Sequence, residues 1–175
     1  MDQSQYKIVV TGPYAAGKST FVRALCGDAV SIDSFGTTVV MDYGQRKYND
    51  ADVSIFGTPG QSRFNHMIKI IGKDADGIIL VIDSVFPETW HYALNMINRV
   101  INVGSTPYII AANKQDLKNA RSPEDIKKEL NVNVPIIGTI AITGENVESS
   151  FDTLMGMIEK KNKNNKEEDT GQEIH

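Results

Sequence analysis

The sequence lacks the features of a secreted or membrane-embedded protein. Its one cysteine, Cys26, cannot form an internal disulfide, which is typical of a reducing compartment. No apolar run reaches the roughly 18–20 residues of a membrane-spanning helix, and the first residues form no apolar signal-peptide stretch. Asp2 stands where myristoylation requires glycine, and the final Gln-Glu-Ile-His does not match a prenylation box. We therefore expect a cytoplasmic protein whose sequence encodes no lipid anchor.

Positive charge is also scarce. The 175 residues include 18 Lys and Arg against 22 Asp and Glu, which gives a net charge of −4. Domains that bind nucleic acids or anionic membranes carry an excess of positive charge. We therefore expect neither of these partners.

Apolar runs alternate with segments of helical periodicity along the whole chain. The runs at 7–11, 77–83 and 107–112 are almost continuously apolar, as in strands that are covered on both faces. This alternation predicts an α/β fold with a mostly parallel sheet and helices on both faces. We expect six strands, at 7–11, 38–43, 52–56, 77–83, 107–112 and 134–138, and helices at 18–26, 61–73, 88–103, from Ser122 onward and around 151–158.

One pair of strands departs from the parallel arrangement. The runs at 38–43 and 52–56 have no helix between them, and Asn49-Asp50 provides a turn. These features predict an antiparallel edge strand.

The chain has the length of one domain and shows no internal repeat. From Lys160 onward, Lys, Asn and acidic residues follow one another without an apolar side chain, which predicts disorder. We expect one domain over 1–160 and a disordered polar tail over 161–175.

The segment Gly12–Ser19 carries the strongest chemical signal. Its sequence, G-P-Y-A-A-G-K-S, matches the phosphate-loop pattern G-x-x-x-x-G-K-[ST], and it lies between a strand and a helix. In such a loop the backbone N–H groups surround the α- and β-phosphates at a helix N-terminus. Lys18 is expected to reach the β- and γ-phosphates, and the Ser19 hydroxyl is expected to bind Mg²⁺.

The segment Asn113–Asp116, N-K-Q-D, follows a buried strand and suits a guanine base. The Asp116 carboxylate only accepts hydrogen bonds. Guanine offers it two adjacent donors, N1–H and the 2-amino group, whereas adenine offers none there. Lys114 can lay its stem over the base, and Asn113 can join this loop to the phosphate loop.

These motifs together resemble the Ras-like small GTPases over residues 6–160. The best match is to prokaryotic members that are similar to the signal-recognition-particle receptor β-subunit and to the bacterial polarity GTPases. The resemblance implies a three-layer phosphate-loop NTPase fold and a small GTPase domain over 1–160. It also implies a switch that binds GTP or GDP with Mg²⁺ and hydrolyses GTP, with effector, exchange and activating proteins that the sequence does not name.

The resemblance assigns the switch residues. The segment Ser34–Asp42 is similar to a Rab-type switch I, so Thr38 is expected to bind Mg²⁺ and sense the γ-phosphate, with Thr37 as the competing assignment. Gly60 matches the glycine whose N–H binds the γ-phosphate, and Gln61 matches the residue that orients the attacking water. Tyr14 stands where Ras-type proteins carry a small glycine, so an incoming arginine finger is expected to be hindered and hydrolysis to be slow.

Two places depart from the family pattern. Gly57 stands where the family has an aspartate that holds Mg²⁺ through a water. Asp83 is the best candidate to replace it, because Asp83 ends a strand beside the phosphate loop; the alternative is that Asp83 only caps the end of its strand. Asp42 is a poorer candidate because it lies four residues past Thr38. In the segment Thr139–Val147, Ala141 matches the alanine whose N–H contacts guanine, whereas Ile142 replaces a lysine.

The sequence therefore predicts a GTP site, and two rival functions remain open. One rival is a non-hydrolysing subunit that holds GTP as a structural ligand. The other is a phosphate-loop kinase or ATPase, although no two of the five arginines lie close together in the sequence. Catalysis is assigned to Gln61, Lys18 and Thr38, metal binding to Ser19 and Thr38, and nucleotide binding to Gly12, Tyr14, Ala15, Ala16, Gly17, Lys18, Ser19, Thr20, Gly60, Asn113, Lys114, Asp116, Ala141 and Ile142.

Overall fold

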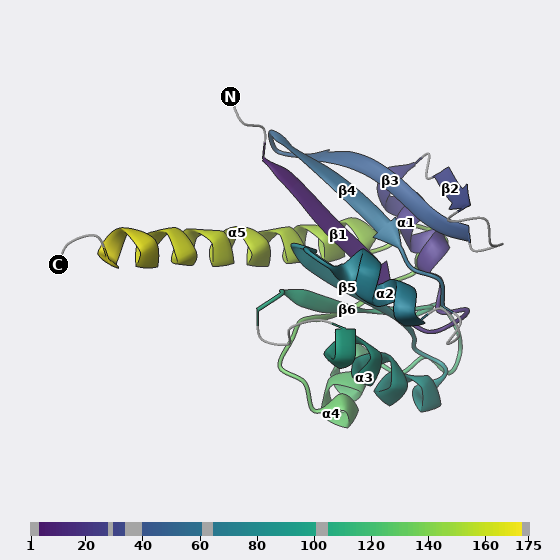
Figure 1. Ribbon diagram of the computed structural model, residues 1–175. Helices are drawn as coiled ribbons and strands as arrows, with labels where there is room; N and C mark the ends of the chain where they lie inside the picture. Colours follow the sequence, from purple (N-terminus) through teal and green to yellow (C-terminus); the bar gives the residue numbers. More distant parts are fainter. Residues whose placement is uncertain (1–3, 28–29, 34–39, 61–64, 101–104, 173–175) are drawn as a thin grey trace.

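The computed structural model describes residues 4–27, 30–33, 40–60, 65–100 and 105–172. One sheet runs through the molecule, with strands in the order β2-β3-β4-β1-β5-β6-β7 (Figure 1). The strands are β1 (Gln5–Thr11), β2 (Val30–Asp33), β3 (Val40–Tyr48), β4 (Ala51–Gly57), β5 (Gly77–Asp83), β6 (Tyr108–Asn113) and β7 (Ile136–Gly138). The helices are α1 (Lys18–Cys26), α2 (Asn65–Gly72), η2 (Pro87–Thr89), α3 (Trp90–Val100), α4 (Pro123–Leu130) and α5 (Val147–Gln172).

The sheet is covered by helices on both faces, which confirms the predicted fold class. Alternate residues of a strand point to opposite faces, and β5 is buried along its whole length. Ile79 and Val81 of β5 belong to the core under α1 and α5. Ile78 and Leu80 belong to the core under α2, α3 and α4.

The sheet differs from the prediction at its antiparallel end. The pairs β3–β4 and β2–β3 are antiparallel, whereas β1 pairs in parallel with β4 and β5. The short strand β2 adds a seventh strand outside the six that were expected, so β3 lies second from the edge. Asn49, with a φ of 51°, begins the tight turn between β3 and β4, as expected.

The register of β3 places Asp42 directly opposite Gly57 at the carboxyl end of β4.

An ion pair fixes β3 against the helices behind it: Arg46 binds both carboxylate oxygens of Glu148 on α5. The Arg46 guanidinium also lies 4.3 Å from the ring centroid of Phe151 and donates to the Leu25 carbonyl at 3.1 Å. Its hydrogen bonds and charge hold the pKa of the Glu148 carboxyl below its usual value.

The ends of the helices follow local sequence signals. Ser122 caps α4, as expected, because its Oγ accepts a hydrogen bond from the Asp125 N–H at 3.2 Å. Trp90 at the start of α3 is fully buried, and its Nε1 donates to the Asp83 carbonyl at 2.7 Å. This bond joins α3 to the carboxyl end of β5.

Helix α5 continues through Gln172, where the composition predicted a disordered tail from 161. Its buried residues end at Ile158, and the rest extends beyond the sheet (Figure 1). Glu159, Lys163 and Glu167 follow one another at a spacing of four, which brings opposite charges together on a helix. Among the described residues, no helix is both long enough and apolar enough to cross a membrane.

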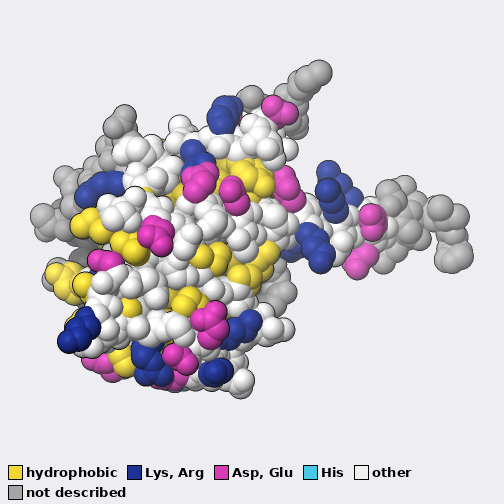
Figure 2. Space-filling model, turned by 180° about the vertical axis from the view of Figure 1, so that it is seen from behind, with side chains coloured by type: hydrophobic (Ala, Val, Ile, Leu, Met, Phe, Trp, Pro, Cys, Tyr) yellow, Lys and Arg dark blue, Asp and Glu magenta, His cyan; other side chains and the backbone are white. Residues whose placement is uncertain are grey.

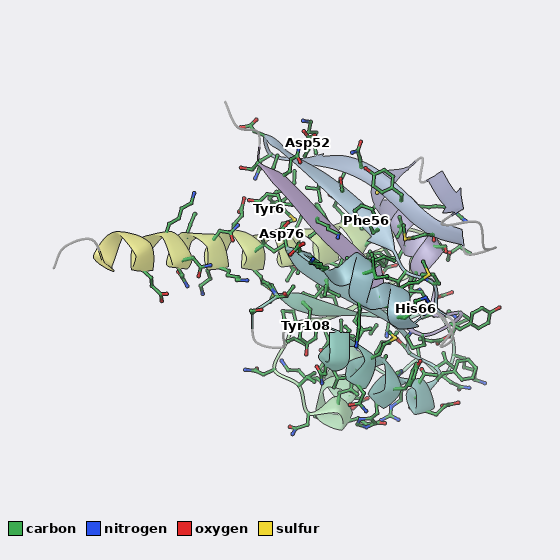
Figure 3. All side chains as sticks on the ribbon, in the orientation of Figure 1. Tyr6, Asp52, Phe56, His66, Asp76 and Tyr108 are labelled. Carbon is green, nitrogen blue, oxygen red and sulfur yellow. The ribbon has the colours of Figure 1, made fainter. Side chains whose placement is uncertain are left out.

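The amino-terminal end of the sheet is closed by polar contacts. Asp76 accepts a hydrogen bond from the Lys7 backbone N–H at 2.7 Å, and it lies near Tyr6 and far from the phosphate loop (Figure 3). On the face shown in Figure 2, basic and acidic side chains are interspersed over the body of the molecule. The motifs lie at the other end of the sheet, where the parallel strands have their carboxyl ends.

Candidate nucleotide-binding site

The phosphate-loop segment connects β1 to α1 as predicted. A Cβ on Gly12 would lie 2.0 Å from the Val81 carbonyl oxygen, so the loop passes β5 too closely for any other residue. Ala15 and Gly17 have positive φ values of 61° and 99°. No side chain caps the start of α1, so its first N–H groups are left for a ligand, as at anion sites on helix N-termini.

Lys18 lies under this loop and is buried. Its Nζ donates to the Pro13 carbonyl at 2.6 Å. Burial lowers the pKa of Lys18 to about 8, although the nearby Asp42 carboxylate favours the charged form. A bound phosphate would add further negative charge beside this ammonium group.

Gly60 approaches the phosphate loop closely. A Cβ at this position would lie 2.4 Å from Lys18 Nζ and 2.8 Å from the Cα of Tyr14. The structure therefore places Gly60 directly against Lys18 and the phosphate loop, and its contact with the γ-phosphate stays a prediction. Tyr14 itself is 72% exposed.

The carboxylate beside Ser19 is Asp42 and not Asp83, which the sequence ranked first; which of the two supports a metal ion stays a prediction. Ser19 Oγ donates to Asp42 Oδ2 at 2.5 Å. A Cβ placed on Gly57 would lie 3.1 Å from the Asp42 Cβ and 3.5 Å from its Oδ2, so the Asp42 side chain occupies the space beside the missing aspartate. The cause is the strand register, which sets residue 42 opposite residue 57 across the antiparallel pair.

Asp83 serves the other half of the site. Its Oδ2 lies 2.5 Å from Lys114 Nζ, and its Oδ1 accepts from the Val85 N–H at 2.9 Å. Lys114 Nζ also donates to the Ala15 carbonyl at 2.7 Å. Asp83 therefore holds the Lys114 side chain against the phosphate loop.

Asn113 joins three segments, of which only the connection to the phosphate loop was predicted. Its Nδ2 donates to the Ala16 carbonyl at 2.9 Å, which connects it to the phosphate loop. Its Oδ1 accepts from the Ala141 N–H at 2.9 Å and from Thr139 Oγ1 at 3.2 Å. The loops after β1, β6 and β7 are thereby held together.

These loops enclose a cleft of about 220 Å³. Its walls come from Gly17 and Thr20 at the start of α1, from Lys114 and Asp116, and from the segment 140–142. Asp116 and Ile142 are exposed, and Ile142 is 81% exposed. The apolar and acceptor groups of this cleft suit a flat base that carries hydrogen-bond donors.

Two predicted residues, Thr38 and Gln61, lie outside the described residues. The contacts that were not predicted include the Ser19–Asp42 bond, the Lys114–Asp83 pair, and a buried bond in which Thr58 Oγ1 donates to Thr11 Oγ1 at 2.7 Å. Only the first could have been anticipated, by testing the antiparallel register that the turn at Asn49 implies.

Comparisons with known proteins agree with the fold and the motifs. Human ADP-ribosylation factor-like protein 4A is 30% identical over 173 residues, which covers 90% of this chain and 86% of that protein. The mutual gliding-motility protein MglA of Myxococcus xanthus is 28% identical over 170 residues, covering 85% of this chain and 86% of that protein.

Solved structures support the fold alone, because the identities are low. The small GTPase Arl6 of Trypanosoma brucei superimposes with a TM-score of 0.73 at 17% identity, covering 90% of this chain and 99% of that one. The G domain of the T. maritima FeoB iron transporter gives a TM-score of 0.69 at 24% identity, covering 90% and 98%.

The decisive match is to a family model. The model of the ADP-ribosylation factor family matches residues 1–158, which is most of the chain. The chain therefore belongs to the ADP-ribosylation factor family of Ras-like small GTPases.

Proposed function

We propose that this protein is a cytoplasmic switch that binds GTP and GDP with Mg²⁺ and hydrolyses GTP slowly. The observation that carries the proposal is the convergence of two motifs on one site. Asn113 and Lys114 of the base-recognition segment make direct hydrogen bonds to Ala16 and Ala15 of the phosphate loop. A nucleotide with its phosphates on the loop would therefore place its base beside Asp116. Residues 1–160 would form the whole nucleotide-binding domain.

The residues around Ser19 fit a magnesium ion. Ser19 Oγ uses its hydrogen toward Asp42, so its lone pairs remain for a cation. Ser19 and Thr38 would bind Mg²⁺ directly, together with phosphate oxygens and waters, which suits an ion that keeps several waters. Asp42 would act from the outer shell by orienting Ser19. When bound, the ion would neutralise charge on the β- and γ-phosphates.

The chain supplies positioning groups for hydrolysis. Lys18 would contact the β- and γ-phosphates, the Gly60 N–H would contact the γ-phosphate, and Gln61 would orient the attacking water. Tyr14 projects from the loop at 72% exposure and would hinder an arginine finger, which is otherwise worth about 10³–10⁵ in rate. Slow hydrolysis follows, and effector, exchange and activating proteins would control the switch.

Single-turnover hydrolysis separates this proposal from its rivals. The protein is purified, its bound nucleotide is identified by chromatography, and [γ-³²P]GTP is then followed with Mg²⁺. We expect bound guanine nucleotide and slow, Mg²⁺-dependent release of phosphate. Intact GTP without turnover would instead support the non-hydrolysing subunit. A preference for ATP would support a phosphate-loop kinase or ATPase.

A further inference from the structure

Gln115 is the residue of the Asn113–Asp116 segment to which no direct contact with the nucleotide has been assigned. Its side chain nevertheless makes two hydrogen bonds. Gln115 Nε2 donates to Ser84 Oγ at 2.8 Å and to the Arg121 carbonyl at 2.9 Å. Its backbone N–H donates to the Thr139 carbonyl at 3.1 Å. Gln115 is thus connected to the segments that follow β5, precede α4 and follow β7.

The backbone at this point needs such support. Lys114 has a φ of 66°, in the left-handed region, which is strained for a residue with a side chain. A strained residue persists only where its surroundings fix it. Asp83 fixes the Lys114 side chain. Ser84, which directly follows β5, accepts a hydrogen bond from the Gln115 side-chain amide.

The space around Gln115 is also limited. A Cβ on Gly138 would lie 3.1 Å from the Gln115 Cγ, so β7 packs directly against the glutamine stem. Ser84 is fully buried, and its backbone N–H donates to the Asn113 carbonyl at 3.0 Å. The Ser84–Gln115 bond therefore ties a buried, fixed element to the residue that precedes Asp116.

Asp116 needs a fixed orientation more than its neighbours do. It is exposed, and among the described residues it has no ion-pair partner. A carboxylate that binds N1–H and the 2-amino group together must present both oxygens in the plane of the base. Binding geometry of this kind tolerates deviations of only about 10–20°.

We propose that Gln115 is a positioning residue for guanine recognition: its bonds to Ser84 and the Arg121 carbonyl aim the Asp116 carboxylate at both donors of the base. This inference rests on the proposed guanine-nucleotide function. In this view, the anchoring of Gln115 lets the protein distinguish guanine, which has two donors, from a base that has one.

The test compares GDP with inosine diphosphate, which keeps N1–H and lacks the 2-amino group. Dissociation constants of the nucleotide-free full chain are measured for both ligands and for ADP. In the wild type, a hydrogen bond to the charged Asp116 should favour GDP over inosine diphosphate by about 10- to 100-fold. Gln115→Met keeps the length of the side chain and removes the donor. We define the ratio as the dissociation constant of inosine diphosphate divided by that of GDP, so that a high value means a preference for GDP. We expect this variant to lower the ratio by at least about fivefold.

The matched control is Gln45→Met, the same chemical change on exposed β3, which should leave the ratio unchanged. Ser84→Ala removes the acceptor and keeps Gln115, so it should lower the ratio in the same direction even if Gln115→Met folds poorly. A merely structural role would weaken both ligands equally and lower the melting temperature with the ratio intact. That result, in either variant, would overturn the inference. A wild type that binds ADP as tightly as GDP would refute the proposed function itself.

Discussion

Asp42→Ala should raise the Mg²⁺ concentration that nucleotide binding requires. Asp42 Oδ2 lies 2.5 Å from Ser19 Oγ, and the residue is only 8% exposed, so solvent screens the carboxylate weakly. Loss of an outer-shell partner of a metal ligand typically costs 10- to 100-fold in metal affinity. We therefore expect the half-maximal Mg²⁺ concentration to rise by about 10- to 100-fold, or about 1.4–2.8 kcal/mol.

The assay is the release of a fluorescent GDP analogue during titration with Mg²⁺. Asp83→Ala is the internal control, because Asp83 binds Lys114 and not Ser19. It should weaken base binding and leave the Mg²⁺ midpoint within about twofold of wild type, as expected for a site without a shared partner. An exchange variant, Asp42→Gly with Gly57→Asp, moves the carboxylate across the strand pair and should partly restore the midpoint.

The reasoning would be refuted by the opposite order of effects. If Asp42→Ala leaves the Mg²⁺ midpoint unchanged, the ion is held by its direct ligands alone. If Asp83→Ala raises the midpoint more than Asp42→Ala does, the carboxylate that matters is the one predicted from the sequence, and the Ser19–Asp42 bond has no part in metal binding.

The remaining predictions concern the phosphates, the base, the water and the pH dependence of stability. Lys18→Ala should weaken GTP binding by at least about 2 kcal/mol in equilibrium titrations, since a charged hydrogen bond is lost; undiminished affinity would contradict the phosphate-loop assignment. Asp116→Asn should shift preference from guanine toward xanthine nucleotides, which competition binding can measure. Gln61→Leu should slow single-turnover hydrolysis with GTP affinity nearly unchanged; an equal rate would mean that another residue places the water. Because Arg46 lowers the folded pKa of Glu148, that carboxylate stabilises the fold above the unfolded pKa of about 4.3 and loses this effect as the pH falls through its folded pKa. The melting temperature of Glu148→Gln should therefore lie below wild type at pH 7 and converge with it in acid, whereas a constant offset, or the same profile in Glu88→Gln, would argue against the linkage.

The sequence predicted the buried centre of the fold best. Strands such as β5 are continuously apolar, and a strand buried on both faces leaves few alternatives. The short edge strand β2 was missed, because four residues at an edge carry little periodicity. The polar end of α5 was missed for a different reason: its composition resembles a disordered tail, whereas spaced opposite charges and continuity with a packed helix favour the helical form.

The motifs were predictable because each is local in the sequence. Asn113 ends the buried strand β6, and Ser19 lies in the first turn of α1. The residues next to each of them are enough to place it in the fold. The role of Asp42 depends instead on the register between β3 and β4, which counts residues across a turn and not along one strand. Distance along the strand from Thr38 therefore did not predict the contact between Asp42 and Ser19. The bond from Gln115 to Ser84 joins residues 31 positions apart and leaves no local signal.

The central claim is that one cleft binds a guanine nucleotide through Asp116 and the phosphate loop. The most direct measurement is calorimetric titration of the nucleotide-free protein with GDP and with ADP, both in Mg²⁺. Because guanine offers Asp116 two charge-assisted hydrogen bonds and adenine offers none, we expect GDP to bind at least about 100-fold more tightly. Equal affinities for GDP and ADP would contradict the account.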